Sequence, residues 1–228
     1  MGFFAKAKLP RFWGGFFKKG AVIMKVLMIN GSPHAKGNTA LALEQMADVF
    51  HQEGVETQMI QVGHLDVRGC MACGACRNLG KCVFDDVVNT LTDALRDADG
   101  LVVASPVYYA SANATLLAAL DRLFYSKSFD TRMKVGASVA VARRGGCSAT
   151  FDQLNKYFTI SGMPVASSTY WNSVHGRTPG EAAQDAEGIA TVRNLAKNMT
   201  FLMKSIALGK EAYGLPAPEP RAMTNFIR

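Results

Sequence analysis

The stretch that decides the fold is MKVLMINGSPHAKGNT, residues 24–39. It opens with a short apolar run typical of a buried strand, and it continues through glycine and small polar residues directly into a helical pattern. A strand that leads through such a turn into a helix brings backbone N–H groups together with the side chains of Ser32, Asn38 and Thr39 at a helix N-terminus. The stretch therefore predicts an anion site.

The spacing within this turn restricts the kind of anion. A P-loop requires Gly, four residues and then Gly-Lys-Ser/Thr, whereas here Lys36 precedes Gly37 and Asn38 follows it. The Gly-x-Gly-x-x-Gly pattern is also absent. The available donors favour the monoester phosphate of flavin mononucleotide (FMN) over a nucleoside triphosphate with Mg²⁺. The structural alternative is that Ser32 or Asn38 only caps the helix.

Beyond this turn, short apolar runs alternate with segments of helical period, which is typical of repeated βα units around a parallel sheet. The predicted strands are residues 25–29, 55–62, 101–104, 135–142 and 164–171. The apolar periodicity predicts helices around residues 43–50, 88–98, 116–124, 151–158 and, as the longest, 181–208. A sheet of this kind binds its ligand at the carboxyl ends of the strands.

Length and charge limit the function classes. A chain of 228 residues with 49% hydrophobic and 19% charged residues is expected to form one folded domain. Of the net charge of +7, residues 1–20 carry +5 without a carboxylate, which leaves only +2 for the rest and removes the support for nucleic-acid binding. We find no stretch suited to a membrane span or a secretory signal, and a cytoplasmic location is therefore expected.

The predicted organisation has three parts. Residues 1–23 form a basic, aromatic leader, expected to be disordered or to act as an arm on a membrane surface or a partner subunit. Residues 24–208 form the domain and include a cysteine loop at 66–84. Residues 209–228, which are rich in proline, are expected to form a tail on a neighbouring surface.

The cysteines carry the second chemical signal. Cys70, Cys73, Cys76 and Cys82 form a Cys-x2-Cys-x2-Cys-x5-Cys cluster, and Cys147 stands alone as an ordinary loop or buried thiol. Without a secretory signal, clustered thiols indicate metal or redox chemistry rather than disulfides. This compact spacing favours an iron-sulfur cluster over zinc, whose knuckles are usually further apart. Zinc and free or reversibly oxidised thiols remain alternatives.

Several motifs together resemble one family. They are Gly-Ser-Pro-x3-Gly-Asn-Thr at 31–39, Ser-Pro-Val-Tyr-Tyr at 105–109, Leu-Asp-Arg at 120–122, Tyr-Trp-Asn at 170–172, Val-His-Gly at 174–176 and Thr-Asn-Phe-Ile-Arg at 224–228. From residue 24 onward the chain resembles the flavodoxin-like NAD(P)H-dependent FMN reductases, and within them the iron-sulfur flavoproteins. The resemblance implies a flavodoxin-like three-layer α/β sandwich whose five-stranded parallel sheet has the order 2-1-3-4-5.

The resemblance also implies a set of site residues. The phosphate would be held by Ser32, Gly37, Asn38 and Thr39, with His34 at the rim. The flavin ring would be lined by Pro106, Val107, Tyr108 and Tyr109, and closed over by Arg143, Arg144, Gly145 and Gly146. The four clustered cysteines would bind a [4Fe-4S] cluster. Tyr108 and His175 are the candidate catalytic residues, and Asp121 with Arg122 is expected to form an intrahelical or subunit-facing ion pair.

An independent chemical argument supports part of this set. Reduced flavin develops negative charge at its pyrimidine edge, and a nearby arginine or backbone N–H stabilises that charge. Arg143 and Arg144 are suited to this role, and the alternative for both is a solvated basic loop.

The activity that the resemblance implies is the transfer of a hydride from NAD(P)H to FMN, followed by reduction of a small acceptor such as a quinone, a nitro compound or a flavin. The alternative is an electron carrier that serves a protein partner, in which the cluster divides two electrons into single steps. A zinc-stabilised binding module is a third, weaker hypothesis, because it leaves residues 31–39, the phosphate turn, unexplained. The resemblance further implies a homodimer or homotetramer.

Overall fold

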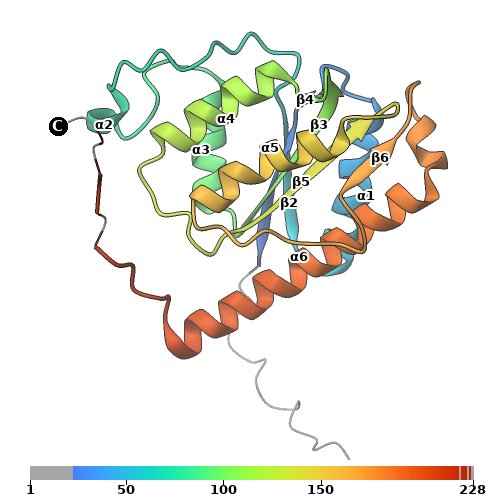
Figure 1. Ribbon diagram of the computed structural model, residues 1–228. Helices are drawn as coiled ribbons and strands as arrows, with labels where there is room; N and C mark the ends of the chain where they lie inside the picture. The colour runs from blue at the N-terminus through green and yellow to red at the C-terminus, as the bar shows by residue number, and fades with distance from the viewer. Residues whose placement is uncertain (1–22, 221, 225, 227–228) are drawn as a thin grey trace, which may run out of the picture.

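The computed structural model describes residues 23–220, 222–224 and 226. Apart from Ile23, the predicted leader lies outside these residues. Strands β2 (Glu56–Gln61), β1 (Lys25–Asn30), β3 (Gly100–Tyr108), β5 (Val135–Ala142) and β6 (Ser173–His175) lie side by side in this order, and all neighbouring pairs are parallel (Figure 1). A short strand β4 (Ser111–Ala112) pairs antiparallel with β3. Since β5 and β6 are the fourth and fifth parallel strands, the predicted order is confirmed.

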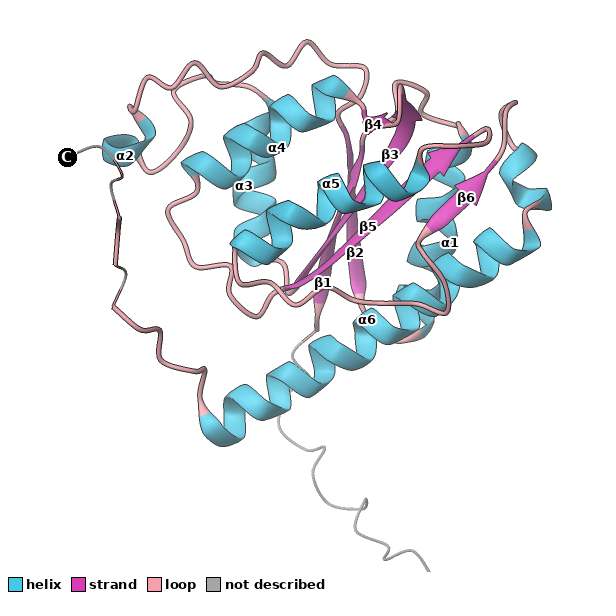
Figure 2. Cartoon of the chain, viewed as in Figure 1, coloured by secondary structure: helices cyan, strands magenta, loops and turns pink. Residues whose placement is uncertain are grey.

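Helices cover both faces of the sheet, as the predicted three-layer sandwich requires (Figure 2). One face packs against α1 (Asn38–Gln52) and α6 (Ala186–Tyr213), and the other against α3 (Val87–Asp97), α4 (Ala114–Ser126) and α5 (Cys147–Ile160). Side chains of a strand alternate between these two layers: in β1, Val26 and Met28 face α1 and α6, whereas Leu27 and Ile29 face the other side. Burial on both faces explains why this strand is a continuous apolar run.

The predicted fifth strand, 164–171, is wrong. Val165 makes only an isolated bridge to Gly136, and regular pairing resumes at Ser173, which is opposite Ala140. Between these two points the chain advances eight residues, from Val165 to Ser173, while β5 advances only four, from Gly136 to Ala140. The extra residues bulge away from the sheet. The bulge is held by α6 instead, through Ser168 Oγ to Thr191 O at 2.6 Å and Asn198 Nδ2 to Ser167 O at 2.8 Å.

Two other boundaries differ from the prediction. Strand β3 continues four residues beyond Ala104, to Tyr108, because Val107 and Tyr108 pair with Ala112 and Ser111 in a hairpin. At the end of the domain, residues Glu181–Gln184 form a short 3-10 helix, η1, and α6 starts at Ala186. Helix α6 then runs through Gly209 to Tyr213 and ends at Gly214 in a left-handed φ of 71°, so the predicted end before Gly209 is also wrong.

The remaining helix, α2 (Cys76–Leu79), is a single turn in the cysteine loop and packs against α4 (Figure 1). Residues 215–218 of the predicted tail line a pocket together with Arg132, Met133 and Gly162. Within the described part of the chain, no helix combines the length and the apolar character that crossing a membrane requires.

Candidate functional site

The turn after β1 is tightly built by its neighbours. Gly31 N donates to Ala104 O at 2.8 Å, and a Cβ on Gly31 would lie 2.6 Å from Leu116 Cδ2 of α4. A Cβ on Gly63, in the connection after β2, would overlap the backbone of Gly31 and of Ser32. Gln61 Nε2 donates to Ser32 O at 2.9 Å. Contacts from β2, β3 and α4 therefore support the conformation of the turn.

The turn presents backbone donors. Gly37 is the N-cap of α1, and the first intrahelical bond is Leu41 N to Gly37 O at 3.1 Å, which leaves the N–H groups of Asn38, Thr39 and Ala40 without an acceptor inside the helix. These groups and the positive end of the helix dipole suit an anion such as a phosphate. The Ser32 hydroxyl accepts from His34 N at 3.1 Å and so shapes the turn, while the side chain of His34 is exposed.

The side chain of Asn38 has a role that the sequence did not indicate. Its Nδ2 donates to Thr178 O at 3.0 Å, and its Oδ1 accepts from Ala182 N at 3.2 Å. A Cβ on Gly176 would lie 2.8 Å from the same Nδ2. Asn38 thus ties the start of α1 to residues 176–182. Because these partners are about 140 positions apart in the chain, no local pattern could reveal them.

Residues 107–112 form a hairpin with a strained tip. Both residues at its tip, Tyr109 and Ala110, have positive φ values, 51° and 57°, as a type I′ turn requires. Such a conformation is uncommon for residues other than glycine, asparagine and aspartate. Tyr109 is fully exposed and Tyr108 is 43% exposed. The hairpin pairing engages part of the backbone of Val107 and Tyr108, two residues that the resemblance assigns to the flavin ring.

The loop after β5 packs on this hairpin. Gly146 has a φ of 93°, and a Cβ there would lie 2.8 Å from Val107 Cγ1 and 2.9 Å from Ala110 Cα. Arg143, Arg144 and Gly145 are exposed beside it. The structure therefore brings together the two segments predicted to surround the flavin ring, 106–109 and 143–146. Only glycine allows this close approach at position 146.

His175 lies at the end of β6, between an acid and a thiol. Its Nδ1 is 3.4 Å from Asp185 Oδ2, and the same oxygen accepts its backbone N–H at 2.7 Å. On the other side, His175 Nε2 is 4.0 Å from Cys147 Sγ. Asp185 is itself held as the N-cap of α6 by Gly188 N at 2.9 Å. Burial, together with the charge of Asp185, raises the pKa of the Cys147 thiol, which therefore stays protonated at neutral pH.

The four clustered cysteines meet in one place. All four line a single pocket together with Arg122, Phe84 and Ser126. Cys70 and Cys73 are exposed, whereas Cys76 and Cys82 are partly buried. The loop that carries them has left-handed φ values at Ala72, 54°, and at Gly74, 71°. Left-handed residues next to right-handed ones form concave groups of N–H donors, which are common around iron-sulfur clusters.

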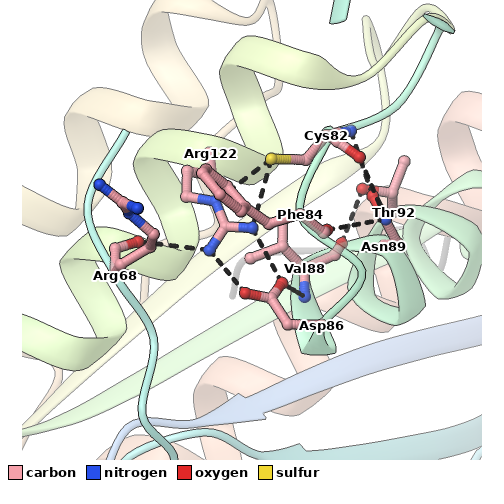
Figure 3. Close-up of polar contacts among 8 residues, drawn as sticks. All are labelled: Arg68, Cys82, Phe84, Asp86, Val88, Asn89, Thr92 and Arg122. Carbon is pink, nitrogen blue, oxygen red and sulfur yellow. Dashed lines mark hydrogen bonds and ion pairs between the residues drawn. The ribbon is translucent and has the colours of Figure 1, made fainter. Parts of the chain in front are cut away.

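Arg122 of α4 is the buried centre of this region (Figure 3). Only 1% of its surface is exposed. It pairs with Asp86 through bonds of 2.7 and 2.9 Å and donates to Cys82 Sγ from Nε at 3.3 Å and Nη2 at 3.2 Å. Burial opposes its charge, but the hydrogen bonds to Asp86 and Cys82 outweigh burial and raise the pKa of Arg122. The predicted pairing with Asp121 is wrong, because Asp121 instead accepts from the Tyr157 hydroxyl.

The residues of this pocket fit an iron-sulfur cluster. Among the described residues, no three His, Cys, Asp or Glu side chains converge closely enough to hold a single ion. A cubane has a larger body and takes one thiolate at each of four irons, so it needs its sulfur ligands further apart. The buried Ser126 hydroxyl, which has no hydrogen-bond partner, also lines the pocket and could donate to such a body.

Helix α4 connects the two regions. Its Leu116 packs on Gly31 of the phosphate turn, and its Arg122 holds Cys82. The two residues are six positions apart, which is roughly 9 Å along a helix axis. The connection after β2 forms a second link, because it supports the turn at Gly63 and continues to Cys70. The phosphate turn and the cysteine pocket thus share their supporting elements.

The chain is similar to known proteins in sequence and in fold. Residues 24–178 match the model of a family described as NADPH-dependent FMN reductase. An iron-sulfur flavoprotein of Methanocaldococcus jannaschii is 34% identical over 191 residues, 80% of this chain and 99% of that protein. Another from Methanosarcina thermophila is 33% identical over 192 residues, 82% of this chain and all of that protein. A solved structure of RosB with a bound flavin-phosphate intermediate has a TM-score of 0.63 at 16% identity, covers 90% and 94% of the two chains, and supports the fold alone.

Proposed function

Because the chain belongs to the NADPH-dependent FMN reductase family, we propose that it is an iron-sulfur flavoprotein that passes electrons between FMN and a [4Fe-4S] cluster. The observation that carries this proposal is the single pocket lined by Cys70, Cys73, Cys76 and Cys82 beside the buried Arg122. Four thiols that line one pocket match the number of ligands that a [4Fe-4S] cluster takes. When bound, FMN supplies one- and two-electron chemistry, and the cluster supplies single-electron chemistry.

The residues of the chain have separate tasks in this proposal. The N–H groups of residues 38–40 hold the phosphate, and Asn38 fixes residues 176–182 beside it. The hairpin with Tyr108 and Tyr109 and the loop 143–146 flank the flavin ring. Gly146 keeps these two segments together, and the exposed Arg143 and Arg144 supply positive charge. The cysteines hold the cluster within the same chain.

His175 is the residue placed to move a proton. Asp185 orients its ring through Nδ1, so that Nε2 points to Cys147 and remains available at the partly exposed edge of the site. A carboxylate beside one ring nitrogen fixes the orientation of the ring and therefore which nitrogen faces a substrate. A substrate beside the flavin could receive or release a proton at Nε2.

A second candidate function is an NAD(P)H-dependent reductase of a small acceptor such as a quinone, a nitro compound or a flavin. The exposure of Tyr108 and Tyr109 beside the loop 143–146 favours it, because exposed rings provide a stacking surface for a planar substrate. The location, cytoplasmic, and the assembly, a homodimer or homotetramer, remain predictions on both proposals.

Anaerobic absorption spectroscopy with iron, sulfide and zinc analysis tests the proposal. We expect flavin bands together with a broad iron-sulfur absorption and about four irons per chain. A protein that binds neither FMN nor iron contradicts it, and zinc in place of iron contradicts the cluster. Bleaching of the flavin by NAD(P)H supports the reductase, whereas reduction only by a low-potential protein donor supports the electron carrier.

A further inference from the structure

Cys82 is held differently from the other cysteines of the pocket. Its backbone N–H donates to Asn89 Oδ1 at 3.1 Å, and its carbonyl accepts from Asn89 Nδ2 at 3.2 Å (Figure 3). The same Nδ2 also donates to Phe84 O at 3.0 Å. One side chain of α3 therefore fixes the backbone of Cys82 in both directions, while the sulfur is held separately by Arg122.

Arg122 is itself completely fixed, because each of its five N–H groups has an acceptor. Nη1 donates to Asp86 Oδ2 at 2.7 Å and to Arg68 O at 3.3 Å, and Nη2 donates to Asp86 Oδ1 at 2.9 Å. The remaining two N–H groups, on Nη2 and Nε, point to Cys82 Sγ. The guanidinium also lies 5.1 Å from the ring centre of Phe84. A planar guanidinium whose five N–H groups all donate hydrogen bonds is held in one orientation. The fold therefore sets its position relative to the sulfur of Cys82.

Asp86 anchors this arrangement to α3. It is the N-cap of α3 and accepts from Val88 N at 3.1 Å with the same oxygen that receives Arg122 Nη2. Its side chain is 28% exposed, whereas that of Arg122 is 1% exposed. The guanidinium is thus the charged group of the pair that is shielded from water and directed at the sulfur.

We propose that Arg122 is a positioning residue for the iron-sulfur site: it holds Cys82 in place as a cluster ligand and raises the reduction potential of the cluster. The inference rests on the proposed function. Reduction adds negative charge to the cluster and its sulfur ligands, and N–H groups directed at a sulfur stabilise that charge. Asp86 should have the opposite effect, because its carboxylate offsets the positive charge of Arg122.

The test uses the full-length protein with its cluster reconstituted under anaerobic conditions. The variants are Arg122→Met, Arg122→Lys and Asp86→Asn, and Arg132→Met is the matched control, since Arg132 forms a similar but exposed pair with Asp130. The measurements are the reduction potential, the electron paramagnetic resonance spectrum of the reduced cluster, and the rate at which a chelator removes iron. Circular dichroism establishes that each variant is folded.

We expect Arg122→Met to lower the potential and to release iron about tenfold faster, because loss of an outer partner of a metal ligand weakens metal binding by about 10- to 100-fold. Asp86→Asn should raise the potential and keep the cap, because asparagine caps helices as well as aspartate. Arg122→Lys should retain the charge but not the fork, with a potential between those of the wild type and Arg122→Met. Arg132→Met should match the wild type in every measurement.

A purely structural role for Arg122 predicts no opposite shifts in potential. Unchanged potentials, or shifts of Arg122→Met and Asp86→Asn in the same direction, overturn the inference. Should Arg122→Met fail to fold, the potential of Asp86→Asn and the iron release of Arg122→Lys decide the question. A wild-type chain that takes up no cluster contradicts the proposed function itself. If the wild type takes up the cluster and the variants have its potential and rate of iron release, only the role of Arg122 is contradicted.

Discussion

The phosphate turn, residues 31–39, and the cysteine loop, residues 66–84, follow neighbouring strands of one sheet but are built in opposite ways. In the turn, glycines pack against other backbone segments so closely that a Cβ at Gly31 would lie 3.0 Å from Ala104 O. In the cysteine loop, a Cβ on Gly69 or Gly74 would meet no atom within 4 Å, and Cys70 and Cys73 are exposed. Helix α4 holds this loop at two points, Arg68 O and Cys82 Sγ, both through Arg122, and α3 holds the backbone of Cys82 through Asn89.

This difference indicates how each site meets its ligand. Packing against the sheet shapes the turn before a phosphate arrives, which reduces the entropy that binding must overcome. Cys70 and Cys73 are exposed and lack such support, so we expect metal binding to order them against Cys82, which α3 and α4 already hold. The two sites should therefore respond differently to substitution and to loss of the ligand.

The largest expected effect concerns the preorganised cysteine. Cys82→Ser should abolish a stable cluster, because it removes the ligand held by Arg122, and iron should fall from about four per chain to near zero. Flavin content should remain, since the phosphate turn is built by other residues. Iron and FMN analysis of the same sample checks both statements. The matched control is Cys147→Ser, which lies beside His175 and should keep its iron. Equal iron in both variants contradicts the assignment of Cys82.

Gly63 and Gly69 give a direct comparison of the two regions. Gly63→Ala would press a methyl group onto the backbone of Gly31 and Ser32, and we expect it to lower the free energy of unfolding by about 1–3 kcal/mol and to weaken FMN binding. Gly69→Ala adds the same group where no atom lies within 4 Å and should change little. Denaturant unfolding and FMN titration measure both effects. Similar losses for the two variants would show that the turn is not the more tightly packed region.

Asn38→Asp tests whether the side chain holds the turn or the phosphate. The carboxylate cannot donate to Thr178 O, so we expect a loss of about 1–2 kcal/mol in the free energy of unfolding even without FMN. Denaturant unfolding of the flavin-free protein measures it. If stability is unchanged and only FMN affinity falls, then the side chain acts on the phosphate instead.

The smallest expected effect concerns Cys147. Burial and the charge of Asp185 raise its pKa, so at any pH below that pKa a smaller fraction is thiolate than in an unfolded chain. Alkylation by iodoacetamide at pH 8 should therefore be slower in the folded protein than in urea, and its midpoint should lie at higher pH. Mass spectrometry of the peptide that contains Cys147 gives both rates. Asp185→Asn should move the midpoint down, and an unchanged midpoint would exclude the contribution of Asp185.

Local patterns were sufficient wherever the chain's own neighbours determine the structure. The apolar run 25–29 and the helical periods around residues 43–50 and 116–124 correctly predicted β1, α1 and α4. The predicted fifth strand failed because Ser167 and Ser168 find partners on α6, and periodicity does not show such competition. The hairpin at Tyr109 and Ala110 was missed for a similar reason, since neither residue is typical of a type I′ turn.

The sequence by itself determined the alternating α/β class, the turn after the first strand and the compact spacing of the four cysteines, because strands, turns and ligand spacings depend on residues close together in the chain. The sheet order came from the resemblance to the family and not from such local patterns. Only the tertiary structure decided which residues support these groups. Asn38 forms hydrogen bonds with Thr178 and Ala182. Arg122 binds Asp86 and Cys82 instead of its neighbour Asp121. The partners of a buried charge are the groups that tertiary packing places beside it. Packing brings together segments that lie far apart in the sequence, so the spacing of residues does not predict these partners.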